Sequence, residues 1–151
     1  MYFAISKHKL ACFCRLDSAD RWLLLHAAVW LAIARIMLAV LPFRRLSVCL
    51  SAGGDSAQLA SDPEVLRRIG RAVSIAANNV PWRADCFPQA IAARMLLRRR
   101  RYGSVMHLGA ARIGDNERAA HAWLTCGGTI VTGGAQRGRY TELHALNSPH
   151  P

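Results

Sequence analysis

The spacing of apolar residues changes once along the chain. Up to about residue 103, apolar residues recur every three or four positions, which is typical of the buried face of a helix. After that point they alternate with polar residues in short runs, which is typical of half-buried strands. A block of helices followed by an antiparallel sheet indicates an α+β fold.

Three helices are predicted in the first block. The leading one falls within residues 21–50, follows the carboxylates of "DSAD" and stops near Pro42, which has no backbone N–H to donate. The second falls within residues 61–80, where Asp62 precedes a proline and a glutamate. The third begins near Cys86, in "CFPQAIAARMLL". Each of the last two therefore has a recognisable start.

The ends of the third helix are predicted from single residues. Asp85 adjoins Cys86 and is expected to cap the helix N-terminus. The helix then runs into "RRRRYG", where positive charge suits a C-terminus and Gly103 suits a left-handed stop.

Four strands are predicted in the second block, in "SVMHLGAARI", "HAWLTC", "TIVTGG" and "YTELHAL", with a hairpin turn at the glycine pair before "TIV". The domain organisation follows from these elements. Residues 1–20 form an N-terminal arm and residues 21–151 form one domain, whose core lies in residues 61–151. A small, polar stretch, "SAGGDSAQLASD", is predicted to be the surface loop between the leading helix and the core.

Composition narrows the class of protein. The chain has 151 residues, of which 52% are hydrophobic, so it can form a hydrophobic core without a disulfide or a structural metal ion. Twenty basic residues against nine acidic ones give a net charge of +11, which favours an acidic partner surface. No basic run is interleaved with stacking aromatics, so nucleic acid is not expected as a partner.

The five cysteines argue against a secreted or zinc-binding domain. Their number is odd, and no CxxC pair is present, so neither a disulfide framework nor a structural zinc site is expected. A reducing cytoplasm is the expected setting. No metal or other cofactor is expected.

The leading apolar stretch, Trp22 to Phe43, is close to the length that spans a bilayer. His26 and Arg35 interrupt it, and a charge near the centre of a span is costly. The favoured interpretation is a mostly buried helix packed on the rest of the domain. Membrane association and a true span stay open as alternatives. A signal peptide is not expected, because Asp17, Asp20 and Arg21 come directly before the apolar stretch.

Cys86 and His121 are the candidate catalytic pair. Thiol nucleophiles react as thiolates, which a helix N-terminus and a neighbouring imidazole both stabilise. Cys86 stands at the start of a predicted helix, and His121 opens "HAWLTC", the start of a predicted strand beside a turn. A buried thiol and a strand histidine that only packs are the alternatives.

Other residues near this pair are weaker candidates. Trp82, in the loop before the third helix, and Trp123, on the strand face of His121, are candidates for the substrate cleft, with plain packing as the alternative. Cys126 lies five positions after His121 and is expected on the other face of the sheet. His107 and His144 are expected to be structural.

Two motifs, in this order, carry a resemblance to a known family. "DCFPQAIAARMLLRRRRYGSVMHLGAARI" and "AAHAWLTCGGTIVTGG" are similar to the papain and transglutaminase-like superfamily, and in particular resemble the lasso peptide biosynthesis B2 leader peptidases. "RWLLLHAAVWLAIARIMLAVLPFRRL" resembles the leading helix of that family, so the resemblance covers about residues 20–146.

The resemblance implies a cysteine peptidase that removes the leader from a ribosomally made precursor peptide. A separate ATP-dependent cyclase would then close the core peptide. Cys86 matches the nucleophile of the family and His121 its general base. Some members have a third residue, an Asp, where this chain has "TIVTGG". Thr132 and Gly133 stand near the expected place of this residue. The alternatives for orienting the imidazole are Thr132, a backbone carbonyl, a residue from elsewhere, or an incomplete triad.

The resemblance also implies partners. The family uses a small leader-binding domain, and residues 1–16 are too few to fold as one. A separate B1 protein is therefore expected to deliver the precursor. Two other functions stay open: a transglutaminase-like acyltransferase with the same pair, and a non-catalytic, membrane-associated scaffold built around residues 22–43.

Overall fold

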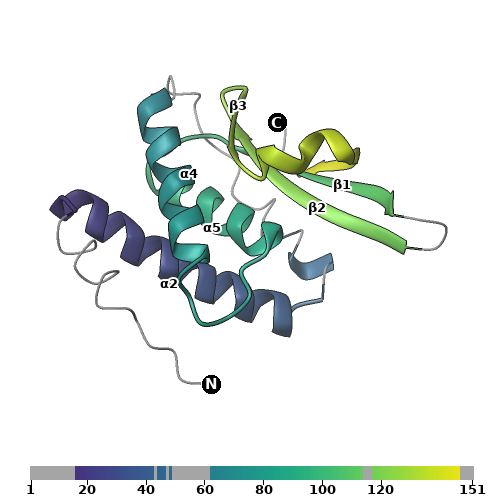
Figure 1. The fold of residues 1–151 in the computed structure, drawn as a ribbon, viewed down its shortest axis with the longest axis horizontal. Coiled ribbons are helices and arrows are strands. Elements are labelled where there is room, and N and C mark those ends of the chain that lie inside the picture. Colours follow the sequence, from purple (N-terminus) through teal and green to yellow (C-terminus); the bar gives the residue numbers. More distant parts are fainter. Residues whose placement is uncertain (1–15, 43, 47, 49–61, 114–116, 147–151) are drawn as a thin grey trace.

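In the part of the chain that the structure describes, three long helices and a short helical turn at 44–46 precede a four-stranded sheet, as the apolar spacing predicts (Figure 1). The computed structural model describes residues 16–42, 44–46, 48, 62–113 and 117–146, and the expected loop at 51–61, most of the arm, and Cys12, Cys14 and Cys49 fall outside these ranges. The elements are α2 (Ser18–Val40), α4 (Pro63–Ala77), α5 (Cys86–Arg99), β1 (Val105–Ile113), β2 (Glu117–Cys126), β3 (Thr129–Thr132), the 3-10 helix η1 (Gly134–Arg139) and β4 (Thr141–Leu146). The α+β fold is confirmed.

The sheet is antiparallel, with its strands in the order β3-β2-β1-β4. The turn between β2 and β3 uses Gly127 and Gly128, both at positive φ, as the predicted hairpin requires. η1 connects β3 at one edge to β4 at the other. Because Arg137 of η1 lies over the ring of Trp123, this connection crosses the face of the sheet that carries Trp123 (Figure 1).

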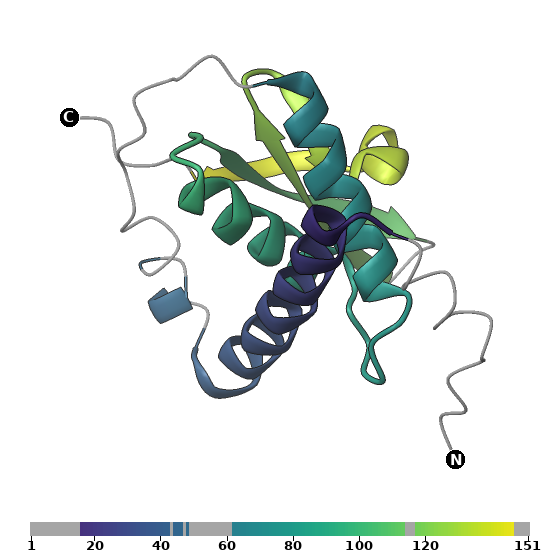
Figure 2. The ribbon, with the colours of Figure 1, turned by 90° about the vertical axis from the view of Figure 1, so that its left-hand side faces the viewer.

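The helices cover the other face of the sheet. α5 packs on β2 and β3, and α4 packs on β3 and α5. α2 packs on α4 and α5, so these two helices form a layer between α2 and the sheet (Figure 2). Large, fully buried apolar side chains come from all three layers and include Leu31, Leu66, Ile69, Ile91, Leu97, Met106 and Leu124.

Helix starts follow the sequence signals in two cases of three. The Asp17 carboxylate accepts a hydrogen bond from the backbone N–H of Ser18 at the start of α2, and Asp62 accepts one from Glu64 at the start of α4. Asp85 occupies the N-cap position of α5 but makes no side-chain capping bond, so the expectation that it caps this helix is wrong. One of its oxygens lies 3.7 Å from Nη2 of Arg83 instead.

The C-terminal end of α5 also differs from the prediction. The left-handed residue after this helix is Arg101, with φ 59°, and not Gly103. Arg94, in the middle of α5, is buried and donates a hydrogen bond to the backbone carbonyl of Ser104 in the segment that follows. Burial lowers the pKa of Arg94, and the like charge of Arg98 adds to this effect. The side chain of Arg94 therefore fixes the chain's path out of α5.

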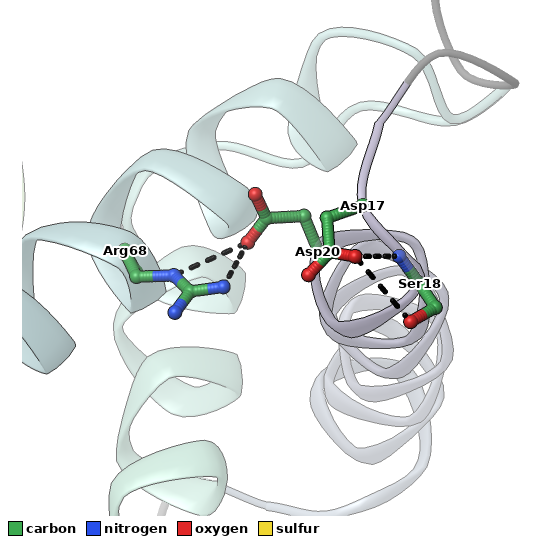
Figure 3. Close-up of polar contacts among 4 residues, drawn as sticks. All are labelled: Asp17, Ser18, Asp20 and Arg68. Carbon is green, nitrogen blue, oxygen red and sulfur yellow. Dashed lines mark hydrogen bonds and ion pairs between the residues drawn. The ribbon is translucent and has the colours of Figure 1, made fainter.

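An exposed ion pair joins α2 to α4. Nε and Nη2 of Arg68 lie 3.2 and 2.6 Å from one carboxylate oxygen of Asp20 (Figure 3). The hydrogen bond and the charge of Asp20 raise the pKa of Arg68. Both side chains are well exposed, so the pair contributes little to stability.

α2 buries one narrow stripe only. Leu23, Ala27, Leu31 and Ala34 are its buried residues, and several large apolar side chains on its other side are exposed. The expectation of a mostly buried helix is therefore wrong. By length and composition alone, α2 could cross a membrane.

Candidate active site

Cys86 is the first residue of α5, as the sequence predicts. Its side chain is half-buried and packs against the core on the helix side of the sheet. The turn before it is held by Gln89, whose Nε2 donates to the backbone carbonyl of Ala84 at 2.8 Å. The Asp85 carboxylate makes no capping bond, so it does not occupy the backbone N–H groups at the start of α5. Such groups can stabilise a thiolate or a developing oxyanion.

His121 lies near the middle of β2, opposite Gly109 of β1, and is 6% exposed. Its Nε2 lies 2.8 Å from the backbone carbonyl oxygen of Gly133. A carbonyl oxygen can only accept a hydrogen bond, so Nε2 carries the hydrogen in this contact. In a neutral imidazole the lone pair is then on Nδ1, which has no hydrogen-bond partner among the described residues. Nδ1 is therefore the atom that can accept a proton.

Thr132, one residue before Gly133, was the side-chain candidate for orienting the imidazole. Its hydroxyl is buried, and within the described residues it makes no hydrogen bond. The contact with His121 comes from the main chain instead, and a backbone carbonyl was one of the alternatives left open by the sequence. Gly133 has φ 77°, and a Cβ there would lie 2.5 Å from the carbonyl oxygen of Ala122. Only glycine fits this position without a shift of the backbone.

Aromatic rings fix the plane of the His121 imidazole. Tyr140 stacks on it with ring centroids 4.9 Å apart. Trp123, on the same face of the sheet as His121, also stacks on the imidazole, with ring centroids 6.1 Å apart. Gly109 makes room for this arrangement, because a Cβ there would lie 2.8 Å from the Trp123 ring. No motif in the sequence marks Tyr140 as part of the site. Its only signal was an aromatic residue next to the final strand.

Trp123 shares the face of His121, as predicted, and Cys126 belongs to the core on the other face. Trp123 is fully buried, and its Nε1 has no hydrogen-bond partner among the described residues. Trp82 is half-buried in the loop before α5, and its Nε1 likewise lacks a partner there. A role for either ring in binding substrate stays a prediction.

The structure does not bring Cys86 and His121 into hydrogen-bond contact. Ala122 and Leu124 of β2 pack in the core on the helix side, where Cys86 also lies. Side chains alternate along a strand, so His121 points to the opposite side, beneath the connection that contains η1. The catalytic pair therefore stays a prediction that requires the two groups to approach each other.

His107 has both ring nitrogens engaged, in contrast to His121. Nδ1 lies 2.7 Å from a carboxylate oxygen of Glu142, and Nε2 lies 2.9 Å from the hydroxyl oxygen of Thr125. The ring also stacks on Trp123, with centroids 5.2 Å apart and planes 1° apart. A histidine held in this way has no free lone pair for a substrate, which agrees with the structural role expected of it. The side chain of His144, the other histidine expected to be structural, lies outside the described residues.

No group of three or more His, Cys, Asp or Glu side chains in the described part of the chain is placed to hold a metal ion. The chemistry available at this site is that of a thiol at a helix start and of an imidazole with a defined tautomer.

Comparison with known proteins gives one match. A family model described as the transglutaminase-like superfamily matches residues 28–145, which is most of the chain. No curated protein and no solved structure is significantly similar to the chain. The matched residues run from α2 to β4 and include both Cys86 and His121.

Proposed function

The chain belongs to the transglutaminase-like superfamily, and from this premise we propose that it is a cysteine peptidase that removes the leader from a lasso peptide precursor. The superfamily is typically one of cysteine-dependent enzymes. The observation that carries the proposal is the hydrogen bond from Nε2 of His121 to the Gly133 carbonyl. It leaves Nδ1 as a base, which is what a thiol nucleophile needs from its partner.

The proposed reaction uses two covalent steps. The Cys86 sulfur attacks the carbonyl carbon before the core peptide, while Nδ1 of His121 takes the thiol proton. The tetrahedral intermediate collapses, the C–N bond breaks, and His121 returns the proton to the leaving amine. Water, activated by the same imidazole, then hydrolyses the thioester and releases the leader.

The proposal requires the sulfur to reach Nδ1 when the precursor is bound. Since Cys86 lies on the helix side of the sheet and His121 points to the other side, this requires a rearrangement of the chain around one of the two residues. In the free protein, the main-chain bond to Gly133 and the stacked ring of Tyr140 hold the imidazole in one tautomer and one plane. In the same proposal, a separate B1 protein delivers the leader, an ATP-dependent cyclase closes the released core, and the reactions take place in the cytoplasm.

Cleavage of a precursor peptide in the presence of a B1 protein tests this function. Replacing the thiol in Cys86→Ala should abolish cleavage and leave the far-UV circular dichroism spectrum unchanged. Cys126→Ala is the matched control, because Cys126 is buried in the core and packs on the other face of the sheet from His121. This control should still cleave. Undiminished cleavage by the Cys86→Ala protein would end the peptidase assignment.

A transglutaminase-like acyltransferase is the second candidate, and the family match favours it as much as a peptidase. The same acyl-enzyme would then be attacked by an amine instead of water. Adding a primary amine to the cleavage reaction distinguishes the two. A stable amide as the main product would indicate acyl transfer, whereas a free carboxylate would indicate hydrolysis.

A further inference from the structure

α2 carries a continuous apolar stripe on the side that faces away from the domain. Its members are the large, exposed side chains of Trp22 (64% exposed), Leu25 (49%), Val29 (55%), Ile36 (62%) and Val40 (73%), here called the α2 outer stripe. Their spacing of three, four or seven positions places them along one face of the helix. Single exposed apolar residues are ordinary, but a contiguous exposed apolar patch marks an interaction site.

The outer stripe lies opposite the buried stripe of α2. Leu23, Ala27, Leu31 and Ala34 face α4 and α5, and α2 forms the outermost layer of the molecule, away from the sheet (Figures 1 and 2). With 23 residues, α2 presents this apolar face over about 35 Å at the usual rise of a helix. The surface is therefore long, straight and accessible.

The packing of α2 excludes a transmembrane orientation in this fold. Ala27, Leu31 and Ala34 are completely buried against the domain, and Asp20 is tied to Arg68 of α4. A helix crossing a bilayer would have to leave these contacts and expose the core of the domain to water. A helix lying flat on a surface keeps them all, because it uses the opposite face.

The charges around the stripe match an anionic surface. Residues 21–54 include Arg21, Arg35, Arg44 and Arg45 and no acidic residue. Arg35, Arg44 and Arg45 are exposed, and the chain as a whole has a net charge of +11. Each basic residue near an anionic membrane adds to the attraction. Trp22, near the N-terminal end of the stripe, is the residue type that favours the boundary between headgroups and acyl chains.

A second copy of the chain is a poorer fit to the same face. Arg21 and Arg35 border the stripe, and pairing two stripes would place arginines of both copies beside one seam without an acidic residue between 21 and 54 to compensate. Like charges across such a seam are unfavourable. The charges therefore favour lipid phosphates over a copy of this helix.

We propose that the α2 outer stripe docks the protein flat on an anionic lipid bilayer, with its apolar side chains inserted at the headgroup boundary and its arginines on lipid phosphates. This inference does not depend on the peptidase function, because none of the stripe residues belongs to the candidate active site. It would place the site at a membrane surface without embedding it.

Co-sedimentation of the full chain with lipid vesicles tests the proposal. Vesicles of phosphatidylcholine with phosphatidylglycerol should bind the protein, and vesicles of phosphatidylcholine alone should bind it at least tenfold more weakly. Raising the salt concentration should weaken binding to the anionic vesicles. Binding that is equal on both kinds of vesicle, or absent from both, would overturn the proposal.

A matched pair of variants locates the surface. The double substitution V29E/I36E places two carboxylates in the outer stripe and should lower vesicle binding at least tenfold. The control, I75E/L143E, makes the same change of charge at exposed apolar positions of α4 and β4 and should stay within about twofold of wild type. Equal loss in both variants would overturn the assignment to α2.

Sedimentation velocity separates lipid from a protein partner. The proposal expects a monomer in the absence of vesicles, for wild type and V29E/I36E alike. A wild-type dimer that V29E/I36E converts to a monomer, together with no vesicle binding, would show that a second copy covers the stripe and would contradict the proposal. Precursor cleavage by V29E/I36E in solution should match wild type, so failure of docking and failure of the peptidase assignment give different results.

Discussion

Nε2 of His121 donates a hydrogen bond to the backbone carbonyl of Gly133, and this single contact sets the tautomer of the candidate base. The residue that supplies the carbonyl must be a glycine, because φ is 77° and a Cβ would lie 2.5 Å from the carbonyl oxygen of Ala122. The partner of the His121 imidazole is thus a main-chain acceptor and not the side chain of Thr132.

Gly133→Ala should therefore damage stability and activity together. The strained φ alone costs about 1–2 kcal/mol in a non-glycine residue, and the clash with the Ala122 carbonyl adds to it by shifting the backbone. Gly128→Ala is the matched control, since Gly128 has φ 78° and no atom within 4 Å of the added Cβ. Urea unfolding should show a clearly larger loss for Gly133→Ala. Equal losses would mean that the close packing around Gly133 is not important.

Thr132→Val distinguishes the main-chain contact from a side-chain one. The Thr132 hydroxyl is buried and makes no hydrogen bond among the described residues, so replacing it by a methyl of similar size removes an unsatisfied polar group. We expect unchanged or slightly higher stability by urea unfolding, and cleavage within about twofold of wild type. A large loss of cleavage with normal stability would show that Thr132 orients the imidazole.

The two described histidines of the sheet should respond differently to substitution. His121→Gln removes the free Nδ1 base and should lower cleavage by about 10²–10⁴-fold. His107→Gln breaks the contacts to Glu142 and Thr125, so it should lower the free energy of unfolding while the rate of cleavage by the folded protein persists. The reverse pattern, with His107→Gln inactive and His121→Gln active, would move the base to His107.

The order of helices and strands, the position of Cys86 and the strand face of His121 could be predicted from short stretches of the sequence. The start of α5 at Cys86 follows from a loop that turns into an apolar, alanine-rich run, and α4 follows from Asp62 and the proline after it. The face shared by His121 and Trp123 follows from strand alternation alone. These features depend on neighbours in the sequence.

The features that were missed depend on tertiary structure. A backbone carbonyl was among the alternatives for the partner of His121, but which carbonyl accepts depends on the pairing of β2 with β3, whose register shifts between Leu124 and Thr125. The exposed face of α2 was missed because this helix is apolar on both sides, so its periodicity does not show which side is covered. The left-handed residue at Arg101 contradicts a local preference for glycine.

The alkylation rate of Cys86 by iodoacetamide, followed by peptide mapping in wild type and His121→Gln, tests the pairing of thiol and imidazole most directly. If His121 promotes the thiolate, Cys86 in wild type at pH 7 should react about tenfold faster than Cys86 in His121→Gln. His107→Gln should keep the wild-type rate, and the buried Cys126 should stay unreactive in all three proteins. Identical rates for Cys86 in wild type and His121→Gln would show that the two residues do not act as a pair.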